Sequence, residues 1–194
     1  MDFKVIVVGA GPAGLAAAVL LAKEGVRAAL VAPPGHDDPR TVALMQPAIQ
    51  LLKYLDVWPG ALAGHAAPLR KLKMIDDTGA VLMAPSLEFD SADLELEAFG
   101  WNIPLGALLP VLRAKAVELG VTFIEAAATG AKSEGDAIRI YLSSGDELSA
   151  QVCIAADGVN SVLRGAAGIS TDAWSYDQVA IATSFAHSMG HGDV

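Results

Sequence analysis

Three glycines near the N-terminus have the spacing of a phosphate-binding turn. Gly9, Gly11 and Gly14 form the pattern G-x-G-x-x-G, with Pro12 and Ala13 between the last two. In such a turn the first glycine lets the chain leave a strand sharply. The second lets bare backbone approach a pyrophosphate, and the third lets the following helix pack closely on the sheet. The free N–H groups and the positive dipole end of that helix then face the phosphates.

The segments on either side of the glycines have the character that this turn requires. Residues 3–8 form an apolar, β-rich run, residues 13–23 form an alanine-rich helical run, and residues 27–32 are predicted as a second strand. Together they make a strand–helix–strand unit, which turns a weak motif into a strong one. We therefore predict that the turn binds the phosphates of a dinucleotide.

The same region also meets a simple criterion for a membrane helix. Residues 5–22 carry no charge, and the run reaches the roughly 18 residues that a membrane span requires. A signal peptide is a second alternative. However, Gly9, Gly11 and Pro12 would break such a helix, and the pattern changes from β-branched to alanine-rich at Gly9. We therefore favour a strand followed by a helix.

The composition fits one medium-sized domain, or one domain with part of a second. The chain has 194 residues, of which 53% are hydrophobic, and a formal net charge of −9. Because an acidic chain without a lysine and arginine cluster binds nucleic acid poorly, we expect no nucleic-acid partner. Cys153 is the single cysteine, which excludes an intramolecular disulfide and fits a reducing compartment such as the cytoplasm.

A second motif follows an apolar strand predicted over residues 148–156. It consists of Asp157, Gly158, Ser161 and Arg164. A carboxylate at the C-terminal end of a strand points into the crevice where open α/β sheets bind nucleotides, and glycine allows close approach of the backbone. The alternative is that Asp157 only caps the helix that follows. The residues of this motif leave both interpretations open.

The remaining elements begin as helices alternating with strands and continue as hairpins. Helices are predicted over 41–55 and 105–119, a strand over 121–125, hairpins over 69–75 with 80–84 and 129–132 with 137–143, an edge strand or loop over 87–96, and a β-like segment over 174–186. This order predicts an α/β fold with a Rossmann-like sheet and an inserted, incomplete β-rich lobe. His187 and His191 have no evident third ligand, so we expect no metal site.

The two motifs together resemble those of the flavin-dependent aromatic hydroxylases of the para-hydroxybenzoate hydroxylase type. The stretches that carry the resemblance are GAGPAGLAAAVLLAKEGVRAALV at 9–31, DPRTVALM at 38–45 and ADGVNSVLR at 156–164. Within this group, residues 41–58, 99–112 and 175–191 look most like the ubiquinone-biosynthesis hydroxylases. The resemblance covers the whole chain, which looks like the N-terminal portion of such an enzyme.

The resemblance implies a cofactor role for several residues. The cofactor-binding set that it implies is Gly9, Gly11, Pro12, Ala13 and Gly14 at the FAD pyrophosphate, Arg40 at the FAD phosphate or the flavin, and Asp157 with Gly158 at the ribityl or pyrophosphate region. It also implies that Arg164 supports the Asp157 turn. The FAD-binding domain would comprise residues 1–72 and 105–168, and the partial substrate lobe would comprise 73–104 and 169–194.

The chemistry implied by the resemblance is reduction of FAD by NAD(P)H, reaction with O₂ and hydroxylation of an electron-rich aromatic small molecule. The flavin supplies the difficult step, while the protein positions the reactants and excludes water. Such an enzyme is compatible with a cytoplasmic location, peripheral association with the inner membrane or a biosynthetic complex, and a homo-oligomer. The alternatives are a phenol or salicylate hydroxylase, a related flavin reductase, or a non-catalytic module that binds a nucleotide or a partner.

The sequence departs from the family pattern at Ala32. The family ends its second strand with Glu or Asp, which binds the adenosine ribose hydroxyls, and here the strand ends in alanine. A hydrogen bond to a charged group contributes about 1.5–3 kcal/mol, so its loss would weaken binding by roughly one to two decades. Asp37 and Asp38 in the following loop are candidates to replace it.

The second departure is length, because family members are considerably longer. After the region of His191 they supply a second Gly-Asp motif and much of the substrate lobe. We expect this chain to expose apolar surface where that half would pack. We also expect it to be purified without tightly bound FAD and without hydroxylase activity.

Overall fold

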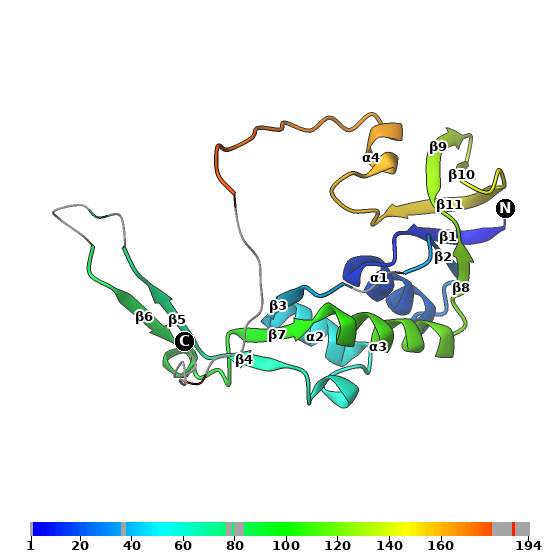
Figure 1. The fold of residues 1–194 in the computed structure, drawn as a ribbon. Helices are drawn as coiled ribbons and strands as arrows, with labels where there is room; N and C mark the ends of the chain where they lie inside the picture. The colour runs from blue at the N-terminus through cyan, green and yellow to red at the C-terminus, as the bar shows by residue number, and fades with distance from the viewer. Residues whose placement is uncertain (1, 36–37, 77–78, 80–83, 180–187, 189–194) are drawn as a thin grey trace.

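The computed structural model describes residues 2–35, 38–76, 79, 84–179 and 188. Its main element is a six-stranded sheet in the order β8-β2-β1-β11-β10-β9 (Figure 1). The strands are β1 (Phe3–Val8), β2 (Ala28–Ala32), β8 (Thr122–Glu125), β9 (Ala128–Glu134), β10 (Ala137–Leu142) and β11 (Glu147–Ala155). Strands β8, β2, β1 and β11 run parallel, and the β9–β10 hairpin completes the sheet in antiparallel pairing. The predicted α/β fold with a parallel sheet is confirmed.

Helix α1 (Pro12–Lys23) connects β1 to β2, as the sequence predicts. The uncharged run 5–22 is therefore divided between a strand and a helix at the glycine turn. In the part of the chain that the structure describes, no helix is both long and apolar enough to cross a membrane. The strand–turn–helix interpretation of this run is correct.

The two faces of the main sheet are buried in separate clusters. Helices α1 and α3 (Leu105–Glu118) pack together on one face (Figure 1), where Val7 and Leu30 are buried. On the other face Ile6, Val31 and Ile140 pack with Leu163 of the short helix α4 (Val162–Ala166). Each large apolar side chain buried in this way contributes about 1.5–3 kcal/mol to stability, so β1 and β2 form a rigid base for the turn between them.

The predicted helix over 41–55 is wrong in its first third. Residues Thr41–Met45 form strand β3, and helix α2 covers only Gln46–Tyr54. Strand β3 pairs with β7 (Gly100–Pro104), which also pairs with β4 (Ala67–Leu69) in a three-stranded sheet. Proline is tolerated in the first helical turn but not in a helix interior, so Pro47 fixes the start of α2 after the strand.

A two-stranded ribbon extends away from both sheets in Figure 1. It consists of β5 (Lys71–Met74) and β6 (Leu87–Asp90). Short 3-10 helices cover Gly60–Leu62, before β4, and Ser91–Leu94, after β6. Register pairs Leu72 with Phe89 and Met74 with Leu87, and these four apolar side chains are between 47% and 57% exposed. This ribbon carries the kind of exposed apolar surface that the length of the chain led us to expect.

Three sequence predictions near the ribbon and the C-terminus either differ from the structure or concern residues that it does not describe. The strand that returns to β5 is 87–90 rather than 80–84, of which residues 80–83 lie outside the described part. Residues 174–179 form no strand, and the rest of the predicted β-like segment lies outside the described residues, as do His187 and His191. No group of three or more metal-ligating side chains occurs among the residues that are described.

Candidate nucleotide site

The turn after β1 can be formed only by glycine at its first position. Gly9 has a φ of 111°, in the region that side chains rarely adopt. Its N–H donates to the carbonyl oxygen of Val31 at 2.8 Å, which ties the turn to β2. A Cβ atom on Gly9 would lie 2.1 Å from the carbonyl oxygen of Ala156. The turn therefore passes directly over the backbone that follows β11.

The other two glycines of the motif have different surroundings. A Cβ atom on Gly14 would lie 1.9 Å from the carbonyl oxygen of Gly9 and 3.3 Å from the Cβ of Ala156. A Cβ atom on Gly11 would meet no atom of the described chain within 4 Å. Gly9 and Gly14 are thus needed for the fold itself, whereas Gly11 presents bare backbone to open space. The sharp turn at Gly9 and the close packing at Gly14 agree with the spacing, and the role of Gly11 at a pyrophosphate stays a prediction.

The start of α1 provides hydrogen-bond donors beside that open space. Gly11 is the N-cap residue, Pro12 begins the helix, and no side chain caps it. The first intrahelical bond from this turn runs from the N–H of Leu15 to the carbonyl oxygen of Gly11 at 3.0 Å. The N–H groups of Ala13 and Gly14 precede it and have no intrahelical acceptor. With the partial positive charge of a helix N-terminus, these groups fit an anionic phosphate.

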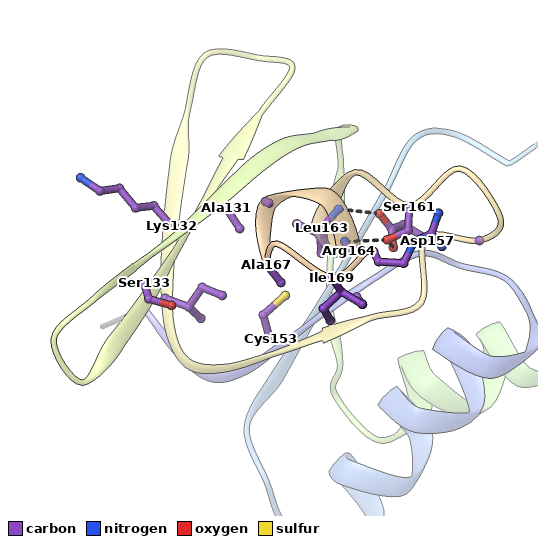
Figure 2. Close-up of a pocket in the computed structure, with 14 residues that line it drawn as sticks. Ala131, Lys132, Ser133, Cys153, Asp157, Ser161, Leu163, Arg164, Ala167 and Ile169 are labelled. Carbon is purple, nitrogen blue, oxygen red and sulfur yellow. Dashed lines mark hydrogen bonds between the residues drawn. The ribbon is translucent and has the colours of Figure 1, made fainter. Parts of the chain in front are cut away.

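The second motif forms a compact, hydrogen-bonded loop. Asp157 Oδ1 accepts from Ser161 Oγ at 2.5 Å, and Asp157 Oδ2 accepts from the N–H of Leu163 at 3.2 Å (Figure 2). Ser161 Oγ in turn accepts from the N–H of Arg164 at 2.9 Å. Arg164 Nη2 donates to the carbonyl oxygen of Val159 at 2.8 Å. Ser161 is therefore the N-cap of α4, and Asp157 holds Ser161 and accepts one further N–H of the first helical turn. Arg164 supports the loop, as the resemblance implies.

Ala156 joins the two motifs. Its N–H donates to the carbonyl oxygen of Val8 at 2.8 Å, and it lies so close to both glycines that a Cβ atom on Gly9 or Gly14 would meet its carbonyl oxygen or its Cβ. The glycine turn and the loop of Asp157 and Gly158 thus lie side by side at the C-terminal ends of β1 and β11. In open α/β sheets this edge is where nucleotides bind.

Comparison with known proteins identifies the fold that carries this edge. The family model described as "FAD binding domain" matches residues 2–188. The chain belongs to the FAD-binding domain family. Relatives and structural neighbours of this FAD-binding domain are named hydroxylases, oxygenases and flavin-dependent monooxygenases.

Two curated relatives match almost the whole chain. The 3-demethoxyubiquinol 3-hydroxylase of Escherichia coli (strain K12) is 30% identical over 90% of this chain and 46% of its own length. The ubiquinone hydroxylase UbiL of Rhodospirillum rubrum is 26% identical over 96% of this chain and 44% of its own length. The chain thus spans about half the length of the curated relatives that it matches.

A solved structure supports the fold of the FAD-binding domain. The flavin-dependent monooxygenase PieE, solved in complex with FAD and substrate, superimposes with a TM-score of 0.71 at 21% identity, covering 89% of this chain and 33% of that chain. The tetrameric form of 2-methyl-3-hydroxypyridine-5-carboxylic acid oxygenase gives a TM-score of 0.68 at 23% identity, covering 89% of this chain and 44% of that chain. At these identities the likeness concerns the fold.

Arg40 of the FAD-binding domain pairs with a neighbouring acid. Arg40 Nε donates to Asp38 Oδ1 at 2.8 Å, and Arg40 Nη2 donates to Asp38 Oδ2 at 2.5 Å. The Arg40 side chain is 74% exposed. Asp37 lies outside the described residues. The Asp38 side chain is only 13% exposed, so this two-pronged ion pair is partly buried and holds the Arg40 guanidinium against Asp38. A role for Arg40 at the FAD phosphate or the flavin stays a prediction.

A cavity of about 450 Å³ opens on the face of the main sheet opposite α1 and α3, between the β9–β10 hairpin, β11 and α4 (Figure 2). Its lining includes Cys153, Ile138 and Ile169, and it reaches Asp157. Burial, with a smaller contribution from the charge of Asp157, raises the pKa of the Cys153 thiol to about 11. The thiol is therefore protonated near neutral pH and is a poor nucleophile. Sequence patterns indicated the hairpin but not this cavity, which depends on where α4 packs.

The loop of Asp157 should make the domain sensitive to acid. Burial tends to raise the pKa of Asp157, but hydrogen bonds from Ser161 and Leu163 outweigh it, so the pKa lies below the ordinary value of 3.8. A lowered pKa stabilises the fold above pH 3.8 and loses that contribution as the pH falls through the folded-state value. We measure the free energy of urea unfolding between about pH 5 and 2, and we expect this free energy to fall less steeply with decreasing pH in Asp157→Asn than in the unmodified chain. The same pH dependence in both proteins would contradict a lowered pKa for Asp157.

Proposed function

We propose that this chain is the FAD-binding part of a monooxygenase that hydroxylates an aromatic ring in ubiquinone biosynthesis, with NAD(P)H as the reductant. The observation that carries the proposal is the contact of Gly9 and Gly14 with Ala156. It sets the N-terminus of α1 beside the loop of Asp157 and Gly158. The names of the Escherichia coli and Rhodospirillum relatives support the substrate class.

Each group at this edge fits one part of FAD. The bare backbone at Gly11 and the N–H groups of Ala13 and Gly14 suit the pyrophosphate. Asp157 keeps acceptor capacity after binding Ser161 and Leu163, because a carboxylate offers about four lone-pair sites. It can therefore also accept from a hydroxyl of the ribityl chain. Bound FAD would supply the redox chemistry with O₂, while these residues hold and orient it.

We also propose the division of the chain that the resemblance implies. Residues 1–72 and 105–168 would form the FAD-binding domain, and residues 73–104 and 169–194 would begin the substrate lobe. Three of the four exposed apolar side chains of the β5–β6 ribbon, those of Met74, Leu87 and Phe89, fall in residues 73–104. They support this assignment because such a surface is suited to packing or to binding an apolar ligand. Association with the inner membrane and formation of a homo-oligomer belong to the same proposal.

The test is equilibrium binding of FAD, followed by the quenching of flavin fluorescence. FMN serves as the control, because it lacks the adenosine and the second phosphate that the glycine turn would hold. We expect FAD to bind at least about tenfold more tightly than FMN, a difference of about 1.4 kcal/mol. Equal affinities would show that the glycine turn does not recognise the dinucleotide.

A nucleotide-binding role without hydroxylation is the second candidate. The replacement of the usual acid by Ala32 favours it. Oxygen consumption with NADPH, FAD and simple phenols or polyprenyl phenols separates the two. A hydroxylated product would support the monooxygenase, whereas FAD binding without a hydroxylated product would support the nucleotide-binding role.

A further inference from the structure

The FAD-binding domain lacks a carboxylate at the end of β2 but has one on the neighbouring strand. β2 ends at Ala32, which is only 9% exposed and offers no acceptor to a ribose. β8 ends at Glu125, whose side chain is 65% exposed. We propose that Glu125 replaces the missing acid and accepts hydrogen bonds from the adenosine ribose hydroxyls of FAD. This assignment rests on the proposed function and deepens it.

The strand register places Glu125 directly beside Ala32. The two residues are paired partners in the parallel ladder of β2 and β8. Neighbouring strands lie about 4.8 Å apart, and paired residues direct their side chains to the same face of the sheet. Both residues also end their strands at the carboxyl edge, where the nucleotide binds in folds of this kind. A glutamate side chain can therefore span from β8 to the space above Ala32.

The surroundings of Glu125 keep its carboxylate at this edge. Arg113 Nη2 of α3 lies 3.6 Å from Glu125 Oε1. The Arg113 guanidinium is itself held over the ring of Phe123, 4.3 Å from the ring centroid. One ion pair leaves most of the lone-pair sites of a carboxylate available. The Glu125 side chain is thus positioned by Arg113 and remains able to bind a pair of hydroxyls.

The loop acids are less suited to this role. Both carboxylate oxygens of Asp38 accept hydrogen bonds from the guanidinium of Arg40. Only 13% of the Asp38 side chain is exposed. Asp37 lies outside the described residues. Compared with Asp38, Glu125 has both the strand register beside Ala32 and the exposure that binding a ribose requires.

The experiment compares Glu125→Gln with Glu118→Gln by titration with FAD. Glu118 is a matched control, because its side chain is 64% exposed and its Oε1 also pairs with a basic side chain of α3, that of Lys115, whose Nζ lies at 2.8 Å. We expect Glu125→Gln to weaken FAD binding about tenfold and Glu118→Gln to leave it unchanged. Circular dichroism confirms that both variants are folded.

A modified ligand separates ribose binding from an indirect effect. The modified ligand is FAD whose adenosine ribose lacks both hydroxyls. We expect the unmodified chain to bind this ligand about tenfold more weakly than it binds FAD. We expect Glu125→Gln to bind the modified ligand and FAD with equal affinity. If the unmodified chain binds FAD but Glu125→Gln binds it equally, or still discriminates between the ligands, the assignment of Glu125 is wrong. If the unmodified chain does not bind FAD, the proposed function itself fails.

Discussion

Replacing Gly9 with alanine is expected to destabilise the domain by about 3 kcal/mol or more. Two physical costs add at this position. The φ of 111° forces a side chain into an unfavourable backbone region, and the new Cβ would lie 2.1 Å from the carbonyl oxygen of Ala156. Because that oxygen belongs to backbone fixed by the bond from Ala156 to Val8, β11 and β1 would have to separate. The measurement is the free energy of urea unfolding.

Gly25 provides the control for the Gly9 variant. It also has a positive φ, 73°, but a Cβ atom there would meet nothing within 4 Å. Gly25→Ala therefore includes the backbone strain of about 1–2 kcal/mol without the collision. The difference between the two variants reports the contact with Ala156. If both variants lost the same stability, the close approach of the two motifs would not exist in solution.

Gly11→Ala is expected to abolish or strongly weaken FAD binding while leaving the domain folded. Gly11 has an ordinary φ of −71°, and its Cβ would enter space that no described atom occupies within 4 Å. The change in folding stability should stay within about 1 kcal/mol. The same methyl group would stand where we place the pyrophosphate, so affinity should fall at least about tenfold, or 1.4 kcal/mol. FAD titration and urea unfolding of the same sample measure both quantities.

The opposite pattern would contradict the placement of the pyrophosphate. An alanine at Gly11 that bound FAD normally would show that the cofactor does not approach this backbone. A variant that unfolded would show that Gly11, like Gly9 and Gly14, serves packing. Gly9 and Gly11 thus test the fold and the site separately, although they are two residues apart.

Local patterns in the sequence were sufficient for the βαβ unit and for α3. The change of period at Gly9 and the apolar spacing along 105–119 are properties of neighbouring residues. Strand β3 could not be predicted in this way, because Thr41–Met45 pairs with Gly100–Pro104, which is far along the chain. Its apolar residues alone fitted a helix equally well. Pro47 was the one local signal that could have placed the helix start correctly.

The sequence proposed candidate residues for the site but could not place them relative to one another. Spacing indicated the roles of Gly9, Gly11 and Gly14, but the contact with Ala156 depends on the pairing of β1 with β11. The two interpretations of Asp157 could not be separated by sequence. In the structure Ser161 is the N-cap of α4, while Asp157 accepts from Ser161 Oγ and from the N–H of Leu163. The position of Glu125 beside Ala32 follows from strand register alone, which no local pattern reveals.

The most direct test of the account is an isothermal titration of FAD into the folded, unmodified chain, repeated in the presence of excess ADP. We expect saturable binding of one FAD per chain, and we expect ADP to compete because it carries the diphosphate and the adenosine ribose that the glycine turn and Glu125 would hold. A folded chain that gave no saturable binding, or binding that ADP did not affect, would contradict the claim that this edge of the sheet holds FAD.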